Sequence, residues 1–243
     1  ANEINYKKTK KFEGYENLFE DERKFNEIIE PSSSLRILLN PAKINIKWTD
    51  EHYQESNNLE NFNYKNLNNL IFSSQKLSRN KINKNFFFDG ENNILADDKG
   101  NIIVYSLKNQ QIIFKYNFYN KKFKKIKKKL NIYVQENKIY VGDNLGYLYA
   151  LDYINKKLLW AKNYKVPFRS NLKVTKDKLV AANQNNNLFF FNKFNGETLK
   201  LIPTEETAIK NKFINNLSLN NNSIFFLNTY GSLFSFDKNA MTL

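Results

Sequence analysis

The chain has 243 residues, a formal net charge of +14, and 41% hydrophobic, 15% aromatic and 26% charged residues. This length is typical of one or two domains or of a single all-β unit, and no apolar run reaches the roughly 18 residues that a membrane-spanning helix needs. The lack of cysteine excludes disulfides and thiolate chemistry, and a single histidine, His52, excludes a multi-histidine metal cage.

The first 45 residues differ from the rest and are interpreted as an N-terminal tail. Within them, residues 16–30 (ENLFEDERKFNEIIE) place Leu18, Phe19, Phe25, Ile28 and Ile29 on one helical face, and Pro31 followed by three serines ends the pattern. The tail is therefore expected to contain one short amphipathic helix, with residues 46–243 forming a second region.

From about Ile44 onward, short runs of β-branched and aromatic residues alternate with Asn, Asp and Gly turns, which predicts many short strands. Around Gly146 the expected order is a strand at 138–142, a turn at 143–146, a strand at 147–152, a turn at 154–156 and a strand ending at Trp160. The region is therefore predicted to be all-β.

This strand pattern repeats along the chain. The turn residue recurs as Gly100, Gly146, Asn186 and Gly231, at intervals of 46, 40 and 45 residues. Glycine adopts positive φ freely and asparagine tolerates it, as such a turn requires. A period of this length in an all-β chain predicts a β-propeller of four-stranded antiparallel blades, with about four repeats present.

An aromatic residue lies fourteen positions after the turn in two of the repeats. It is Phe114 in the Gly100 repeat and Trp160 in the Gly146 repeat, whereas Lys200 stands in its place in the Asn186 repeat. We expect Phe114 and Trp160 to fill the wedge between neighbouring blades and to serve stability.

The run Ile139–Trp160, IYVGDNLGYLYALDYINKKLLW, resembles the tryptophan-containing repeat of the pyrroloquinoline-quinone-like β-propellers. Together with WTDEHYQESNN at residues 48–58, it makes the chain similar to the BamB-like outer-membrane assembly lipoproteins within that family. The resemblance covers about residues 46–243. Because that family has eight blades, the chain is expected to be a truncated propeller.

The resemblance also implies a function. It implies a non-catalytic scaffold in the bacterial periplasm, at the inner face of the outer membrane, although the lipid-bearing cysteine of the family is not visible in this chain. The implied partners are a BamA-like central component of the β-barrel assembly machinery and unfolded outer-membrane protein clients.

Two other classes of function remain open. A quinone-dependent dehydrogenase would share the repeat, but the residues show no carboxylate and amide cluster for calcium, so we expect no catalytic residue, metal or cofactor. A basic RNA-associated propeller of the cytoplasm would account for the charge. Because Asn, Lys, Ile, Phe and Tyr are residues of AT-rich codons, genome bias explains much of the lysine, and we expect no nucleic-acid partner.

Three local features are candidate sites. His52 lies among Asp50, Glu51 and Glu55, which is typical of a hydrogen-bonded loop histidine near Trp48 or, alternatively, of a proton or metal acceptor. The run Lys121–Lys129, KKFKKIKKK, is expected to cross between blades. It is either a solvated edge that blocks aggregation or a contact to an anionic membrane surface or an acidic partner.

The third candidate is the loop at residues 166–170, which carries Phe168 and Arg169. Phenylalanine and arginine are frequent at binding hot spots, and loops at this end of the propeller contact the assembly partner in the similar family. Arg169 and Phe168 are therefore predicted partner contacts. In the alternative, Phe168 packs under the loop and Arg169 pairs with a nearby carboxylate.

A partial ring is also expected to expose apolar blade faces. Leu233, Phe234 and Phe236 are expected to be open to water, which would make the chain associate in spite of its charge.

Overall fold

The computed structural model describes residues 30–36, 38–44, 47–64, 69–70, 72–119, 121–207 and 213–243, and it divides the chain into two units, Ala1–Leu39 and Asn40–Leu243. The helix expected at residues 16–30 lies outside the described residues, apart from its last position. In the first unit, the described residues are exposed and contain one turn at Ser33 and Ser34. Among the residues described, no helix is long and apolar enough to cross a membrane.

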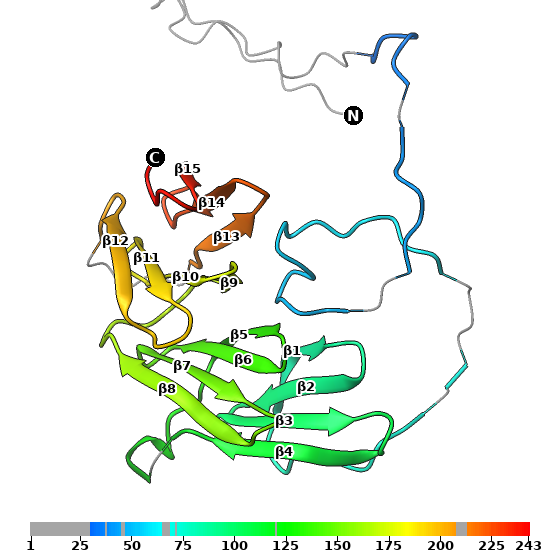
Figure 1. Cartoon of the computed structure of the whole chain (residues 1–243), viewed down its shortest axis with the longest axis vertical. Helices are drawn as coiled ribbons and strands as arrows, with labels where there is room; N and C mark the ends of the chain where they lie inside the picture. Colours follow the sequence, from blue (N-terminus) through cyan, green and yellow to red (C-terminus); the bar gives the residue numbers. More distant parts are fainter. Residues whose placement is uncertain are drawn as a thin grey trace, which may run out of the picture. The chain divides into compact units, whose positions relative to one another are not determined.

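The second unit is built from four antiparallel sheets, here called blades 1 to 4 (Figure 1). Blade 1 contains β1 (Ile82–Phe88), β2 (Asn92–Asp97), β3 (Asn101–Ser106) and β4 (Gln111–Asn117). Blade 2 contains β5 (Leu130–Gln135), β6 (Lys138–Asp143), β7 (Tyr147–Asp152) and β8 (Lys157–Asn163). Blade 3 contains β9 (Lys173–Val174), β10 (Lys178–Ala182), β11 (Asn187–Asn192) and β12 (Thr198–Pro203). Blade 4 contains β13 (Asn216–Leu219), β14 (Ser223–Leu227) and β15 (Leu233–Asp237). A 3-10 turn at Lys121–Phe123 lies between blades 1 and 2.

Each blade is a meander in which consecutive strands pair, so that the first strand of the blade forms one edge of its sheet. This is the blade topology of a propeller. The all-β prediction and the four-stranded blade are confirmed, although blade 4 has three strands among the described residues. The sheets form a partial propeller that does not close into a ring.

The four predicted turn residues occupy equivalent places. Gly100, Gly146, Asn186 and Gly231 each follow the second strand of a blade and have φ values of 85°, 87°, 64° and 90°. In each turn, the backbone N–H of this residue donates to the carbonyl three positions earlier, at N···O distances of 2.9 to 3.4 Å. The four turns therefore share one backbone geometry at equivalent places of the blades.

A carboxylate or amide side chain closes each of these turns. The residues are Asp97, Asp143, Asn183 and Asn228, and the Oδ1 atom of each accepts the backbone N–H groups two and four positions later. This Asx arrangement preorganises the turn before the third strand. The Asp or Asn three positions before each of the four turn residues is therefore also part of the repeat.

The predicted wedge aromatics lie between blades. Phe114 pairs with Val104 across β3 and β4, Trp160 pairs with Ala150 across β7 and β8, and Lys200 takes the same place opposite Phe190. A register shift follows each of these three pairs, so the bulge is also repeated. Phe114 and Trp160 are 5% and 8% exposed, and the indole N–H of Trp160 donates to the Lys193 carbonyl at 2.9 Å.

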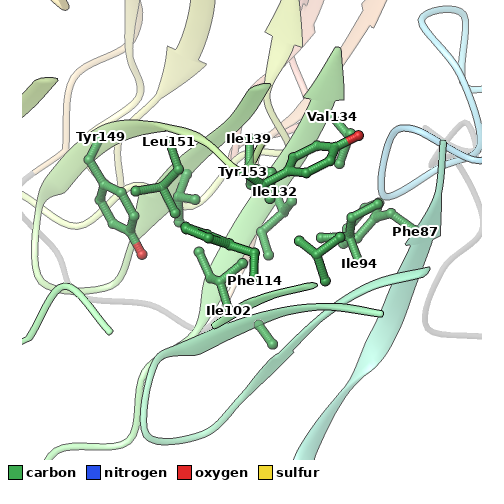
Figure 2. Packing of buried hydrophobic residues seen from close by; sticks show 13 residues of the cluster. Phe87, Ile94, Ile102, Phe114, Ile132, Val134, Ile139, Tyr149, Leu151 and Tyr153 are labelled. Carbon is green, nitrogen blue, oxygen red and sulfur yellow. The ribbon is translucent and has the colours of Figure 1, made fainter. Parts of the chain in front are cut away.

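The core consists of three separate apolar layers, one at each junction between consecutive blades. Figure 2 shows the layer between blades 1 and 2, in which Phe114 and Ile102 of blade 1 pack against Ile132, Ile139 and Leu151 of blade 2. Because each layer is filled from both sides, stability comes from stacking neighbouring blades.

The expectation for blade 4 needs correction. Phe236 is fully buried and Phe234 is half-buried, because both side chains point toward blade 3 and pack in the third layer. Leu233 and Leu227 lie on the other face, and their exposed fractions are 68% and 41%. The open face is therefore less apolar than the sequence suggested, and association of the chain stays a prediction.

Candidate functional site

A segment that precedes the blades in the sequence bonds to the inner edges of all four. We call residues 47–58 the strap. Trp48 forms an antiparallel bridge with Phe88 of β1, and the Thr49 carbonyl accepts the Val134 N–H of β5 at 2.8 Å. The strap therefore occupies hydrogen-bonding positions that the edge strands of an open sheet would otherwise leave vacant.

The same segment meets blade 3 through the Lys173 side chain of β9 and continues to blade 4. The Glu55 carbonyl accepts the Leu219 N–H of β13 at 2.8 Å, and the Asn57 amide donates to the Leu217 carbonyl at 2.7 Å. Within the strap, the rings of Trp48 and Tyr53 meet edge to face at 5.2 Å. The strap thus links the inner strands of the four blades to one another.

A buried ion pair fixes the centre of this arrangement. The Lys173 ammonium of β9 donates to the Asp50 carboxylate, the Gln54 carbonyl and the Asn57 side-chain oxygen of the strap, and the two charged side chains are 0% and 1% exposed. Burial lowers the pKa of Lys173, and the Asp50 carboxylate opposes that shift. A buried ammonium with three acceptors is well satisfied, so the pair specifies where the strap sits.

A cavity of about 510 Å³ lies beside the strap, where the inner strands begin. We call it the axial cavity. It is lined by residues of the strap, of blades 1 and 2 and of the segments before β9 and β13: Glu51, His52, Asn83, Lys84, Asn85, Phe87, Ala96, Lys129, Leu130, Asn131, Ile132, Arg169, Asn171, Ile214 and Asn215. Three features that the sequence singled out, His52, Arg169 and the last lysine of the lysine run, therefore meet in one place.

The loop that carries Arg169 is held by backbone bonds to the turns of blades 2 and 3. The Phe168 N–H donates to the Asp143 carbonyl at 2.9 Å, and the Arg169 N–H donates to the Ala182 carbonyl at 3.1 Å. The Ser170 hydroxyl in turn accepts the Ala182 N–H at 2.7 Å. Arg169 therefore stands on a loop that hydrogen bonds hold in place.

Phe168 lies in the core. It is 2% exposed, and its ring contacts the rings of Tyr164, Phe189 and Phe191 at centroid distances of 5.8 to 6.2 Å. This side chain anchors the loop and cannot reach a partner without leaving the layer between blades 2 and 3. Arg169 is half-buried in the axial cavity, and partner contact through it stays a prediction.

The axial cavity is more basic than acidic. It is lined by Lys84, Lys129 and Arg169 and by a single carboxylate, Glu51, whose pKa is raised by burial. It also contains a side-chain oxygen of Asn215 that is buried and has no hydrogen-bond partner among the residues described. A buried acceptor of this kind is costly unless a donor from elsewhere satisfies it.

His52 and the acidic residues around it do not form a metal site. The His52 backbone N–H donates to the Asp50 carboxylate at 2.9 Å, and that carboxylate also pairs with Lys173. In the described part of the chain, no group of three or more His, Cys, Asp or Glu residues could hold a metal ion.

Comparisons with known proteins address the fold. No family model matches the sequence, and no curated protein does. Among solved structures, the chain is similar to the computationally designed Ika4 protein, with a TM-score of 0.55 and 11% identity over 68% of this chain and 95% of that one. It is similar to the designed Ika8 protein with a TM-score of 0.52 and 11% identity, over 63% of this chain and 44% of that one.

The crystal structure of BamB from Moraxella catarrhalis is also similar, with a TM-score of 0.51 and 11% identity over 63% of this chain and 48% of that one. The chain thus spans less than half of the BamB and Ika8 chains. At this identity the likeness shows a propeller-like fold and nothing finer, and the fold is the part of the family resemblance that it supports.

Sequence reasoning missed the strap and its ion pair. Lys173 lies between the buried residues Leu172 and Val174, and a lysine inside an apolar strand is a signal that it has a buried partner. The sequence around Asp50 points only to the nearby His52. Nothing in the local pattern links two residues 123 positions apart.

Proposed function

We propose that this chain is a non-catalytic propeller scaffold of the bacterial periplasm that assists outer-membrane protein assembly, as the BamB-like repeat at Ile139–Trp160 implies. Its partner is a BamA-like central component of the β-barrel assembly machinery, and its clients are unfolded outer-membrane proteins. The observation that supports this proposal best is that Arg169 stands on a hydrogen-bonded loop in a basic cavity, which is lined by the strap, by blades 1 and 2 and by the segments before β9 and β13.

The chemistry of this cavity favours an acidic segment of the partner. Three basic side chains and one carboxylate line it, and a guanidinium can bind a carboxylate through two parallel hydrogen bonds. The buried oxygen of Asn215 offers an acceptor for a backbone N–H of the same segment. The similarity to BamB supports a propeller of this kind through its fold.

The test is binding of the full chain to the periplasmic domains of the BamA-like component from the same organism, measured by calorimetry. Arg169→Glu is expected to weaken binding at least tenfold, which corresponds to a hot-spot loss of about 1.4 kcal/mol or more. Arg79→Glu is the matched control, because Arg79 is exposed and lies outside the axial cavity. Unchanged affinity in Arg169→Glu, or an equal loss in the control, would refute the proposed contact.

A further inference from the structure

A second cavity, separate from the axial one, is lined by four lysines. It has a volume of about 460 Å³ and lies at the crossing between blades 1 and 2, next to the turn between β2 and β3. We call it the lysine cavity. Its lining consists of Asn80, Lys99, Asn117, Tyr119, Lys121, Lys124 and Lys128, with no carboxylate among them.

One of these lysines is buried. Lys128 is 2% exposed, its ammonium donates to the Phe123 carbonyl, and it lies 5.1 Å from the centroid of the Tyr119 ring. It forms no ion pair with any carboxylate in the described part of the chain. Most of the lysine run is exposed, as the solvated-edge interpretation expected, but Lys128 departs from that interpretation.

The carboxylates nearest to Lys128 are largely occupied by the repeat turns. Asp97 accepts hydrogen bonds from Lys99 N–H, Asn101, Ser78 and Asn80, and Asp143 accepts them from Leu145, Tyr147 and the Tyr119 hydroxyl. Asp98 is close enough to attract Lys128 but does not line the cavity. These groups hold the walls in place and leave the cavity itself cationic.

The other three ammonium groups are available. Those of Lys99, Lys121 and Lys124 have no hydrogen-bond or ion-pair partner among the residues described, whereas the Asn117 side chain is engaged in holding Lys99 and Tyr119. Four like charges around one cavity repel one another, and an anion that enters it offsets this repulsion by attracting all four. Lysine binds phosphate as a compact point charge.

We propose that the lysine cavity binds a phosphate group, carried either by a phospholipid headgroup or by a soluble phosphate ester. Ile126, in the middle of the lysine run, is 42% exposed, and the interface of an anionic bilayer would accept such an apolar side chain next to lysines. The cavity is independent of the axial site, so this inference does not rest on the proposed function.

The experiment compares two double variants of the full chain with the same charge change in the same run. Lys121→Gln/Lys124→Gln removes two lysines that line the cavity, and Lys125→Gln/Lys127→Gln removes two exposed lysines that do not. Binding of glycerol 3-phosphate is measured by calorimetry. Binding to phosphatidylcholine vesicles with and without phosphatidylglycerol is measured by co-sedimentation, and equal melting temperatures confirm that both variants fold.

In Lys121→Gln/Lys124→Gln, the affinity for the probe that binds is expected to fall roughly 30-fold, which is about fivefold for each lysine near the anion. In Lys125→Gln/Lys127→Gln, it is expected to fall much less. Glycerol 3-phosphate binding with this difference identifies a soluble ester as sufficient. Binding to phosphatidylglycerol vesicles alone, with the same difference, identifies the headgroup as the source. An equal loss in both variants would show a diffuse charge effect and overturn the proposal, as would failure of the unmodified chain to bind either probe.

Discussion

Removing the Asp50 carboxylate should destabilise the whole second unit. In Asp50→Ala, the Lys173 ammonium stays fully buried with only two neutral oxygens, from Gln54 and Asn57, as acceptors. Breaking a buried pair by removing one partner costs about 3–5 kcal/mol. For a unit of this size, that corresponds to a fall in melting temperature of roughly 6–20 °C.

Thermal and urea unfolding, followed by circular dichroism, measure this effect. The matched control is Glu60→Ala, which breaks an exposed ion pair with Lys43 at 2.9 Å and should cost about 0–1 kcal/mol. Asp50→Leu combined with Lys173→Met removes both charges and should be more stable than Asp50→Ala. A loss in Asp50→Ala no larger than in Glu60→Ala would refute the argument that the strap is fixed by this pair.

Three further predictions address the repeat itself. Trp160→Ala should lower the free energy of unfolding by about 3–5 kcal/mol, and a loss below about 1 kcal/mol in urea titration would contradict its role between blades. Burial pushes the pKa of Asp97 up, but hydrogen bonds from Asn80, Ser78 and Asn101 outweigh burial and hold it below its usual value. Asp97→Asn should therefore keep the turn but lower the free energy of unfolding above about pH 4. The difference in this free energy from the unmodified chain should shrink as the pH falls through the folded-state pKa of Asp97. A difference that does not depend on pH would argue against this. Gly146→Ala should lower the melting temperature more than Gly231→Ala. An added Cβ at Gly146 would meet the Lys165 backbone at 2.9 Å, whereas one at Gly231 would meet nothing within 4 Å. Equal melting temperatures of the two variants would count against this explanation.

Much of the blade architecture could be predicted from the sequence because its determinants are local. Gly146 and Asn186 mark turns that need positive φ. Side chains of a strand alternate between its two faces, so Tyr149 and Leu151 pack toward one neighbouring blade and Leu148 and Ala150 toward the other. Trp160 and Phe114 could be placed between blades for the same reason. All of these features lie within one repeat of the chain.

The candidate site could be predicted only in part, because its contacts are not local. Arg169 and His52 were recognised by residue type, but the axial cavity that unites them depends on how blades stack. Phe168 and Arg169 are adjacent, and only packing decides that the ring enters the core while the guanidinium stays in the cavity. Lys128 shows the same limit, since its ammonium folds back onto the Phe123 carbonyl and the Tyr119 ring, and its place among exposed lysines does not indicate these contacts.

The position of the strap in the chain has a consequence for the order of folding. Each blade is a meander of neighbouring strands, whose contacts form over short loops and can appear as soon as the strands are synthesised. The strap leaves the ribosome before the four blades described above, yet Asn57 bonds to Leu217, 160 residues further along. Its binding surface is complete only when β13 exists, so we expect the strap to dock last. During synthesis the inner strand edges would then stay open until β13 has been made, and in this interval the chain is most exposed to pairing with another chain.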